Sequence, residues 1–288
     1  MDQQTRLAKL IDLLIEEEPQ WASARATGEL ELPADAEERY RLWRSLVNVR
    51  PPRAASAAYL ELEDAYLQEA LRMRGAVTLS DIAGGPAGPG STAGPGSTGG
   101  GQAEILLWQG DITRLAVDGI VNAANSQMLG CFSPCHGCID NAIHTAAGVR
   151  LRLSCAEIMA AQGGPKPTGS AKITPGFNLP TRHVLHTVGP IVQGPWPTAK
   201  NRADLASCYR SCLELAAAQG LESLAFCCIS TGEFRFPGRE AARIAVDTVR
   251  GWQARARAAG KRVPVVVFNV FKDQDLTIYQ HLLEEHHA

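Results

Sequence analysis

Hydrophobic positions follow a helical period over the first part of the chain. The first group consists of Leu7, Leu10, Ile11, Leu14 and Ile15. A spacing of three and four residues places such side chains on one face of a helix. The same pattern returns over 37–52, where Pro51 and Pro52 end it, and again over 61–73. We therefore expect residues 4–80 to form a helical cap on the following part of the chain. An independent active module is the alternative.

Short apolar runs alternate with helical patterns in the rest of the chain. The apolar runs lie at 104–112, 118–126, 169–177, 183–192, 223–230 and 263–271, and the helical patterns at 139–162, 202–220, 236–260 and 274–287. Continuous apolar strands that alternate with helices indicate an α/β layered domain with a largely central sheet. In such sheets ligands bind in the loops at the strand ends. We therefore look for a site after the runs that end at 126, 230 and 271.

Residues 84–101 interrupt the pattern with Gly, Pro, Ser, Thr and Ala, and the hexapeptide AGPGST occurs at 87–92 and again at 93–98. Such a composition buries too little apolar surface to offset its ordering entropy, so we expect a flexible linker or insertion. The predicted organisation is a helical N-terminal extension over 1–83, a linker over 84–101 and a second domain over 102–288.

Composition narrows the class of protein. Among 288 residues, 45% are hydrophobic and 20% are charged, with a formal net charge of -2, which favours a globular protein without a strong attraction to nucleic acid or anionic membrane. The first residues lack the apolar core of a signal peptide, and no apolar run approaches the ~18 residues of a membrane span. Eight cysteines without a secretion signal indicate reduced thiols. We expect a cytoplasmic protein; a nuclear location stays open.

Polar residues follow several of the predicted strands. Asp111 comes directly after the first strand, where it either accepts from a ligand or caps a turn. Asn122 and Asn125 follow the second strand with small residues between them, so they either approach a polar ligand or form a turn. Gly232 lies between the run at 223–230 and a helix that Pro237 introduces. Backbone N–H groups in such a loop suit a phosphate or diphosphate.

The stretch 130–143 reads GCFSPCHGCIDNAI and concentrates candidate metal ligands. They are Cys131, Cys135, His136 and Cys138, all on one short loop, whereas structural zinc sites usually draw two separated pairs. Adjacent side chains rarely reach one ion together, so we do not expect Cys135 and His136 both to bind. Three protein ligands leave one coordination position open, as in catalytic zinc sites. A purely structural zinc clip and free cysteines are the alternatives.

These segments together resemble a known family. GDIT with VDGIVNAANS, GSAKITPGFNLP with VLHTVGP, and CISTGEFRFPGREAARIA are similar to the sequence motifs of macrodomains, the ADP-ribose-binding fold, over residues 103–285. GCFSPCHGCIDNAIH resembles the zinc-containing subclass of macrodomain mono-ADP-ribosyl hydrolases, and LWRSLVNVRPP resembles its N-terminal helical extension. The resemblance implies a three-layer α/β/α sandwich with a central mixed sheet and with ADP-ribose bound at the strand ends.

The resemblance also assigns roles to individual residues. Asp111, backed by Ile112, would accept from the adenine amino group; Asn122 and Asn125 would line the distal ribose; Ser230, Thr231, Gly232, Glu233 and Phe234 would wrap the diphosphate; Phe236 would lie at the ribose end of that loop; and Asn269 and Phe271 would flank the adenine. Cys131, His136 and Cys138 match the zinc ligands, with Cys135 at a variable position. Asp140, at the start of a helix, matches an acid that orients substrate or water, with a first-turn helix acid as the alternative.

The implied function is a Zn²⁺-dependent hydrolysis that removes mono-ADP-ribose from protein side chains, and we expect the linked residue to be Asp or Glu. Asn125 and Asp140 would fix the catalytic geometry. A reader of ADP-ribosylated proteins without turnover and an O-acetyl-ADP-ribose deacetylase are the alternatives, because one fold serves several activities. The expected partner is a mono-ADP-ribosylated protein, and no nucleic acid or membrane partner is expected.

Overall fold

The computed structural model describes residues 1–84 and 105–285, and in them the apolar runs form a mixed six-stranded sheet. The strand order is β2-β8-β7-β4-β6-β5. The strands are β2 (Ile105–Gln109), β4 (Gly119–Ala123), β5 (Ala171–Pro175), β6 (His183–Thr187), β7 (Ser223–Phe226) and β8 (Val265–Val270). All neighbours pair in parallel except β5, which is antiparallel to β6. Each predicted strand is confirmed.

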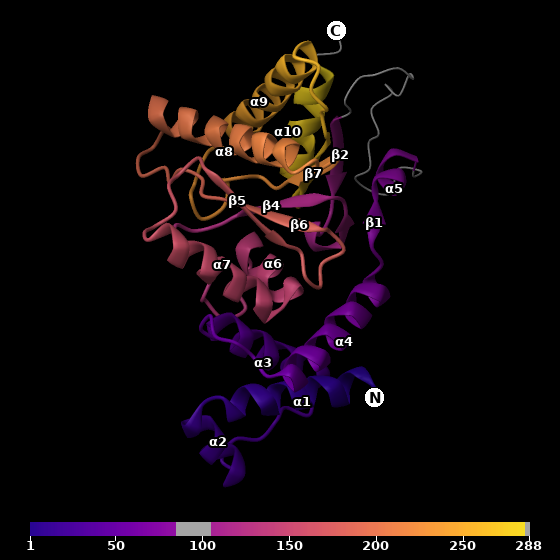
Figure 1. The fold of residues 1–288 in the computed structure, drawn as a ribbon, viewed down its shortest axis with the longest axis vertical. Coiled ribbons are helices and arrows are strands. Elements are labelled where there is room, and N and C mark those ends of the chain that lie inside the picture. Colours follow the sequence, from indigo (N-terminus) through magenta and orange to yellow (C-terminus); the bar gives the residue numbers. More distant parts are fainter. Residues whose placement is uncertain (85–104, 286–288) are drawn as a thin grey trace.

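Helices cover both faces of this sheet (Figure 1). One layer contains α6 (Ile139–Ala147) and α7 (Val149–Gln162), and the other contains α8 (Ala199–Ala218), α9 (Gly238–Ala258) and α10 (Asp273–Glu284). The central strands are buried on both faces because helices cover both: all four residues of β7 are buried. The expected three-layer α/β/α architecture is confirmed.

The first helical pattern of this part divides into two helices at Gly148. We expected one helix over 139–162, and that expectation is wrong. Gly148 has a φ of +88°, in the left-handed region, and a Cβ there would lie 2.5 Å from Oε2 of Glu63. Glycine allows both the backbone turn and the close approach of that carboxyl group. The break directs α6 and α7 separately against the sheet.

The N-terminal residues fold into a helical region with its own apolar core. We use this name for α1 (Gln3–Glu16), α2 (Pro19–Ala26), α3 (Ala36–Val49) and α4 (Ala57–Arg74). Trp43 is fully buried at its centre, among the periodic apolar residues of α1. Asp35 caps α3 and Ser56 caps α4 through side-chain oxygens that accept from backbone N–H groups. The predicted helical N-terminal region is confirmed, and it lies beyond α6 and α7, with α3 against α6 (Figure 1).

A short connection leads from α4 back to the sheet. β1 (Val77–Thr78) pairs in parallel with β3 (Leu115–Ala116), and α5 (Leu79–Gly84) buries Ile82 in the core of the α/β part. Two-residue strands carry no periodic signal, so the sequence did not predict this pairing. Apart from Gly84, the predicted linker over 84–101 lies outside the described residues. Among the described helices, none is long and apolar enough to cross a membrane.

Candidate metal and nucleotide site

The predicted site residues gather at one edge of the sheet because the strands before them run parallel. Asp111 follows β2, the stretch from Asn125 to Cys138 follows β4, the loop 227–237 follows β7, and Phe271 follows β8. The carboxyl ends of parallel strands lie at the same edge. Segments separated by more than a hundred residues therefore meet there.

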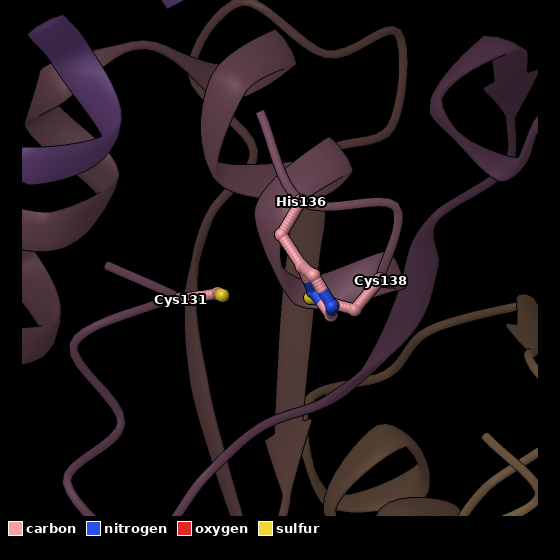
Figure 2. A group of neighbouring side chains, drawn as sticks. All are labelled: Cys131, His136 and Cys138. Carbon is pink, nitrogen blue, oxygen red and sulfur yellow. The ribbon is translucent and has the colours of Figure 1, made fainter. Parts of the chain in front are cut away.

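The loop between β4 and α6 brings three candidate metal ligands together. The ligand atoms of Cys131, His136 and Cys138 all lie within 4.8 Å of one another, and the three side chains point toward one another in Figure 2. All three residues are half-buried, and neither cysteine is in a disulfide. We call residues 129–138 the ligand loop. Two thiols and an imidazole are the donor types that zinc prefers.

Two observations on individual atoms support a metal at this position. Nδ1 of His136 is buried and has no hydrogen-bond partner within the described residues, and a metal would satisfy such a nitrogen. Nε2 of the same ring lies 3.5 Å from Oε1 of Glu233, and a carboxylate at the second nitrogen is a common way to orient a ligating histidine. Cys138 is the N-cap of α6, which fixes one ligand to a rigid element. The donor set therefore fits a zinc ion.

Cys135 lies apart from this group. Its thiol donates to the backbone carbonyl of Arg41 at 3.4 Å, on the side of the helical region. Its φ of +53° is unusual for a residue with a Cβ, and this turn directs the side chain away from its neighbour His136. The arrangement agrees with an ion held by Cys131, His136 and Cys138 without Cys135.

Asp140 is held in the first turn of α6, beneath the ligand loop. It is 5% exposed, and its Oδ1 accepts from Nδ2 of Asn122 at 2.7 Å. Burial raises the pKa of Asp140 to about 6, although the hydrogen bond from Asn122 opposes this shift. Asn122 is fully buried, so it contacts the site through Asp140 rather than from an exposed position.

A second group of buried polar residues supports Asp140, and the sequence did not point to it. His144 of α6, Cys155 of α7 and His186 of β6 lie together, with ligand atoms within 4.8 Å of one another. His186 uses both ring nitrogens: Nδ1 contacts Nδ2 of Asn122 at 3.2 Å, and Nε2 contacts Oγ1 of Thr174 at 2.9 Å. Burial lowers the pKa of His186 to about 3, so this ring is neutral and acts as a fixed polar support.

Asn125 forms the turn that leads into the ligand loop. Its Oδ1 accepts from the backbone N–H groups of Gln127 and Met128 at 3.0 Å each, and its Nδ2 donates to the carbonyl of Gly130 at 3.0 Å. These bonds make it an Asx turn next to Cys131. Of the two predicted catalytic residues, Asn125 therefore shapes the loop backbone, while Asp140 is the buried acid below it.

The loop after β7 has the backbone of an anion site. Ser230 has a φ of +66°, and its carbonyl accepts from the N–H of Phe236 at 2.9 Å, which closes the loop. In the described part of the chain, the backbone N–H groups of Gly232, Glu233 and Phe234 donate to no protein acceptor. Free N–H groups on a loop of this kind suit a diphosphate. Thr231 bonds back to Cys228, and Phe236 is buried in the core rather than facing a ligand.

The residues predicted for the adenine lie at the ends of β2 and β8. Oδ1 of Asp111 accepts from the N–H and hydroxyl of Thr113, and Oδ2 lies 3.1 Å from a guanidinium nitrogen of Arg74 in α4. Asn269 donates to the carbonyl of Gly110 at 2.9 Å, and Phe271 is 76% exposed. Ile112 is buried behind Asp111. The acid, the amide and the exposed ring thus share one corner of the sheet edge.

Comparison with known proteins identifies the family of this chain. The model of the Macro domain family matches residues 121–245. A protein-ADP-ribose hydrolase of Treponema medium is 49% identical over 283 residues, which are 98% of this chain and 100% of that protein. The chain belongs to the macrodomain family.

Two further comparisons are with a second hydrolase and with a solved macrodomain structure. A protein-ADP-ribose hydrolase of Staphylococcus aureus (strain MRSA252) is 45% identical over 251 residues, covering 87% of each chain. The solved structure of a Trypanosoma brucei macrodomain in complex with ADP-ribose is 29% identical, with a TM-score of 0.57, and the match covers 83% of this chain and 94% of that one. The match to the Treponema medium protein spans 98% of this chain and therefore includes the helical region as well as the sheet.

The macrodomain sheet and the helical region meet at residues that the sequence did not single out. Arg44 and Asn48 in α3 and Arg152 in α7 all bond to the ligand loop or to its neighbours. Arginine and asparagine on a helix usually face solvent, and nothing in the local sequence separates these three from others of their kind. Their role follows from the packing of α3 against α6.

Proposed function

We propose that this macrodomain is a zinc-dependent hydrolase that removes mono-ADP-ribose from modified protein side chains. Curated relatives that are 45–49% identical over most of the chain are named protein-ADP-ribose hydrolase, which supports the activity as a whole. The observation that carries the zinc dependence is the convergence of Cys131, His136 and Cys138 within 4.8 Å. The ion would be held by these three side chains.

We call residues 230–234 of the loop after β7 the diphosphate loop. Its position next to the ligand loop supports a catalytic rather than a distant structural ion. Glu233 belongs to the loop after β7, and its carboxylate lies 3.5 Å from His136. A ligand whose diphosphate is bound by residues 230–234 therefore has its distal end close to the ligand loop. When bound, a zinc ion there would supply Lewis-acid chemistry to the reaction.

The protein groups have separate tasks in this proposal. The N–H groups of Gly232, Glu233 and Phe234 bind the diphosphate, and Phe271 offers an exposed ring to the adenine. Asp140 is held by Asn122 and orients the water or the distal ribose.

The proposal extends to an ester link between ADP-ribose and Asp or Glu. A carboxylate leaves without being protonated, so its departure needs no general acid. Such a leaving group suits a site whose buried acid, Asp140, is a hydrogen-bond acceptor toward Asn122 and not a proton donor. Release of ADP-ribose is measured from substrates that carry mono-ADP-ribose on glutamate, serine or arginine. This assay distinguishes the ester linkage from the other two.

The test compares two cysteines of the ligand loop, a candidate ligand and a control. Cys138→Ser removes a candidate ligand, whereas Cys135→Ser changes a thiol that contacts Arg41 instead. The wild type and both variants are assayed for zinc content and for release of ADP-ribose from a mono-ADP-ribosylated protein, with and without a chelator. We expect the wild type and Cys135→Ser to hold one zinc and release the label, and Cys138→Ser to lose both.

Two outcomes would contradict the proposal. Full release by zinc-free protein would make the ion structural. Tight binding of the modified protein with no release under any condition would make the chain a reader.

A further inference from the structure

The last turns of α3 lie against the ligand loop and form a network of hydrogen bonds with it. The bonds join residues that are 87 to 97 positions apart in the sequence. They reach the ligand loop at Cys135 and His136, and the first turn of α6 at Asn141. The helical region therefore contacts the segment that carries the candidate metal ligands, and not only the outer surface of the macrodomain.

Asn48 is the centre of this network. It is 1% exposed, and its Oδ1 accepts from the backbone N–H of Cys135 and from Nδ2 of Asn141, each at 2.9 Å. Its Nδ2 donates to Oγ1 of Thr145 in α6 at 3.1 Å. The amide oxygen thus binds both the ligand loop, at Cys135, and α6, at Asn141, and the amide nitrogen binds α6 at Thr145.

Asn141 transmits this contact to the ligands on either side. It is fully buried; its Nδ2 donates to the carbonyl of Ser133 at 3.0 Å, and its backbone N–H donates to the thiol sulfur of Cys138 at 3.4 Å. Its Oδ1 accepts from Arg44 at 2.7 Å, and the same guanidinium nitrogen donates to the carbonyl of His136 at 2.8 Å. Two of the three candidate ligands are therefore bonded through their backbone or sulfur to this network.

Arg152 fixes the start of the loop from the opposite side. Its Nε donates to the carbonyl of Leu129 at 2.7 Å, and Nη1 donates to the carbonyls of Val47 and Arg50 at the end of α3. The guanidinium also lies over the ring of Phe132, 4.3 Å from its centre. Each end of the ligand loop is thus tied to α3.

We infer that the helical region is part of the metal site: Asn48, with Arg44 and Asn141, holds the ligand loop in the geometry that binds zinc. This inference rests on the proposed zinc site and deepens it. Asn48 is a positioning residue, because it acts on the ligands through the loop backbone. Groups that orient metal ligands are worth about 10- to 100-fold in metal affinity when removed.

A role in packing alone would give a different result, and Asn178 provides the comparison. Asn178 is 4% exposed at the same interface, where it donates to Asp64 of α4 at 2.8 Å and to the carbonyl of Ala147 at 3.2 Å. It makes no bond to the ligand loop within the described residues. Asn178→Ala therefore weakens the contact between the helical region and the macrodomain without changing the support of the loop.

The experiment measures zinc affinity of the full chain by competition with a chromophoric chelator, together with thermal unfolding of the zinc-free protein. The variants are Asn48→Ala, Asn48→Asp, Arg44→Met and Asn178→Ala. We expect the zinc dissociation constant to rise about 10- to 100-fold in Asn48→Ala. Asn48→Asp keeps the oxygen that holds Cys135 and Asn141, so its affinity stays within about threefold of the wild type. Asn178→Ala lowers the unfolding temperature and leaves the affinity unchanged.

Equal zinc affinity in Asn48→Ala and Asn178→Ala would overturn the inference, and so would an equal loss in Asn48→Asp and Asn48→Ala. If Asn48→Ala does not fold, Arg44→Met decides: the half-buried Arg44 contacts the carbonyl of His136 directly, and unchanged affinity there would refute the role. A wild type that binds no zinc would instead refute the proposed function on which the inference rests.

Discussion

Glu63 makes the stability of this macrodomain depend on pH. Its carboxyl group is fully buried between α4 and the start of α7, where it accepts from the hydroxyl of Tyr59 and the N–H of Val149, each at 3.0 Å. Burial raises its pKa from 4.5 to about 7, and the neighbouring Asp64 adds to the shift while Arg150 and the two hydrogen bonds oppose it.

The direction and the size of the change in stability with pH follow from the pKa of Glu63 in the unfolded chain, 4.5, and in the folded protein, about 7. Between pH 4.5 and about 7 the folded protein keeps a proton on Glu63 that the unfolded chain has lost, so stability falls as pH rises through this range. Each pKa unit corresponds to ~1.4 kcal/mol. From pH 5 to pH 8 the wild type should therefore lose about 2–3 kcal/mol relative to a protein that carries a neutral side chain there.

Glu63→Gln supplies that neutral side chain. Urea unfolding of both proteins at several pH values between 5 and 8 should give free energies that diverge as pH rises, with the variant the more stable at pH 8. Because all other groups titrate in both proteins, the difference isolates Glu63. Glu61→Gln, an exposed position on the same helix, should run parallel to the wild type. Parallel curves for Glu63→Gln would refute the argument.

Three further substitutions test the site and the fold. Asp140→Asn should lower release of ADP-ribose at least ~100-fold and change the dissociation constant of free ADP-ribose less than about threefold, measured by calorimetry. Gly148→Ala should cost about 2 kcal/mol or more in urea unfolding, because its Cβ would lie 2.5 Å from Oε2 of Glu63. Gly189→Ala should weaken ADP-ribose binding about tenfold, because its Cβ would lie 2.0 Å from Oγ of Ser230 and displace the diphosphate loop.

Two glycines without close neighbours are the controls. Gly163 has a φ of +72° but no atom within 4 Å of an added Cβ, so Gly163→Ala measures backbone strain without the clash at Gly148. Gly194 also has open space, and Gly194→Ala should leave ADP-ribose binding unchanged. Equal losses in each glycine pair, or loss of ADP-ribose binding in Asp140→Asn, would contradict these assignments.

The strands and the ligand loop could be predicted from the sequence because the patterns that indicate them lie within short stretches of it. Continuous apolar runs such as 223–230 and 263–271 have one stable place in an α/β protein, between two layers of helices. The stretch 130–143 gave four candidate ligands, the resemblance in motifs selected Cys131, His136 and Cys138 among them, and the structure gathers the same three side chains. A resemblance in motifs supplied the order of the loops around them.

The buried residues that support the ligand loop could not be predicted from the sequence, because their roles depend on contacts between distant segments. Asn48 and Asn141 are 93 residues apart and meet only once α3 packs on α6. At Gly148, where the helix breaks, the carboxyl group of Glu63 in α4 lies against the backbone. A single glycine inside a helical pattern does not predict such a neighbour. Asn122 looked like a residue that lines the ligand, but its position in β4 buries it beneath Asp140.

The attachment of the ligand loop to α3 has a consequence for how the protein is made. Domains generally fold as they leave the ribosome, beginning with the N-terminal part. The helical region has its own apolar core around Trp43, so it is a surface on which later segments can dock. We therefore expect Asn48 to be in place when Cys131 to Cys138 emerge. The order of synthesis thus favours early capture of these thiols in their native turn, which limits the time in which they are exposed to oxidation or to mispairing with the remaining cysteines.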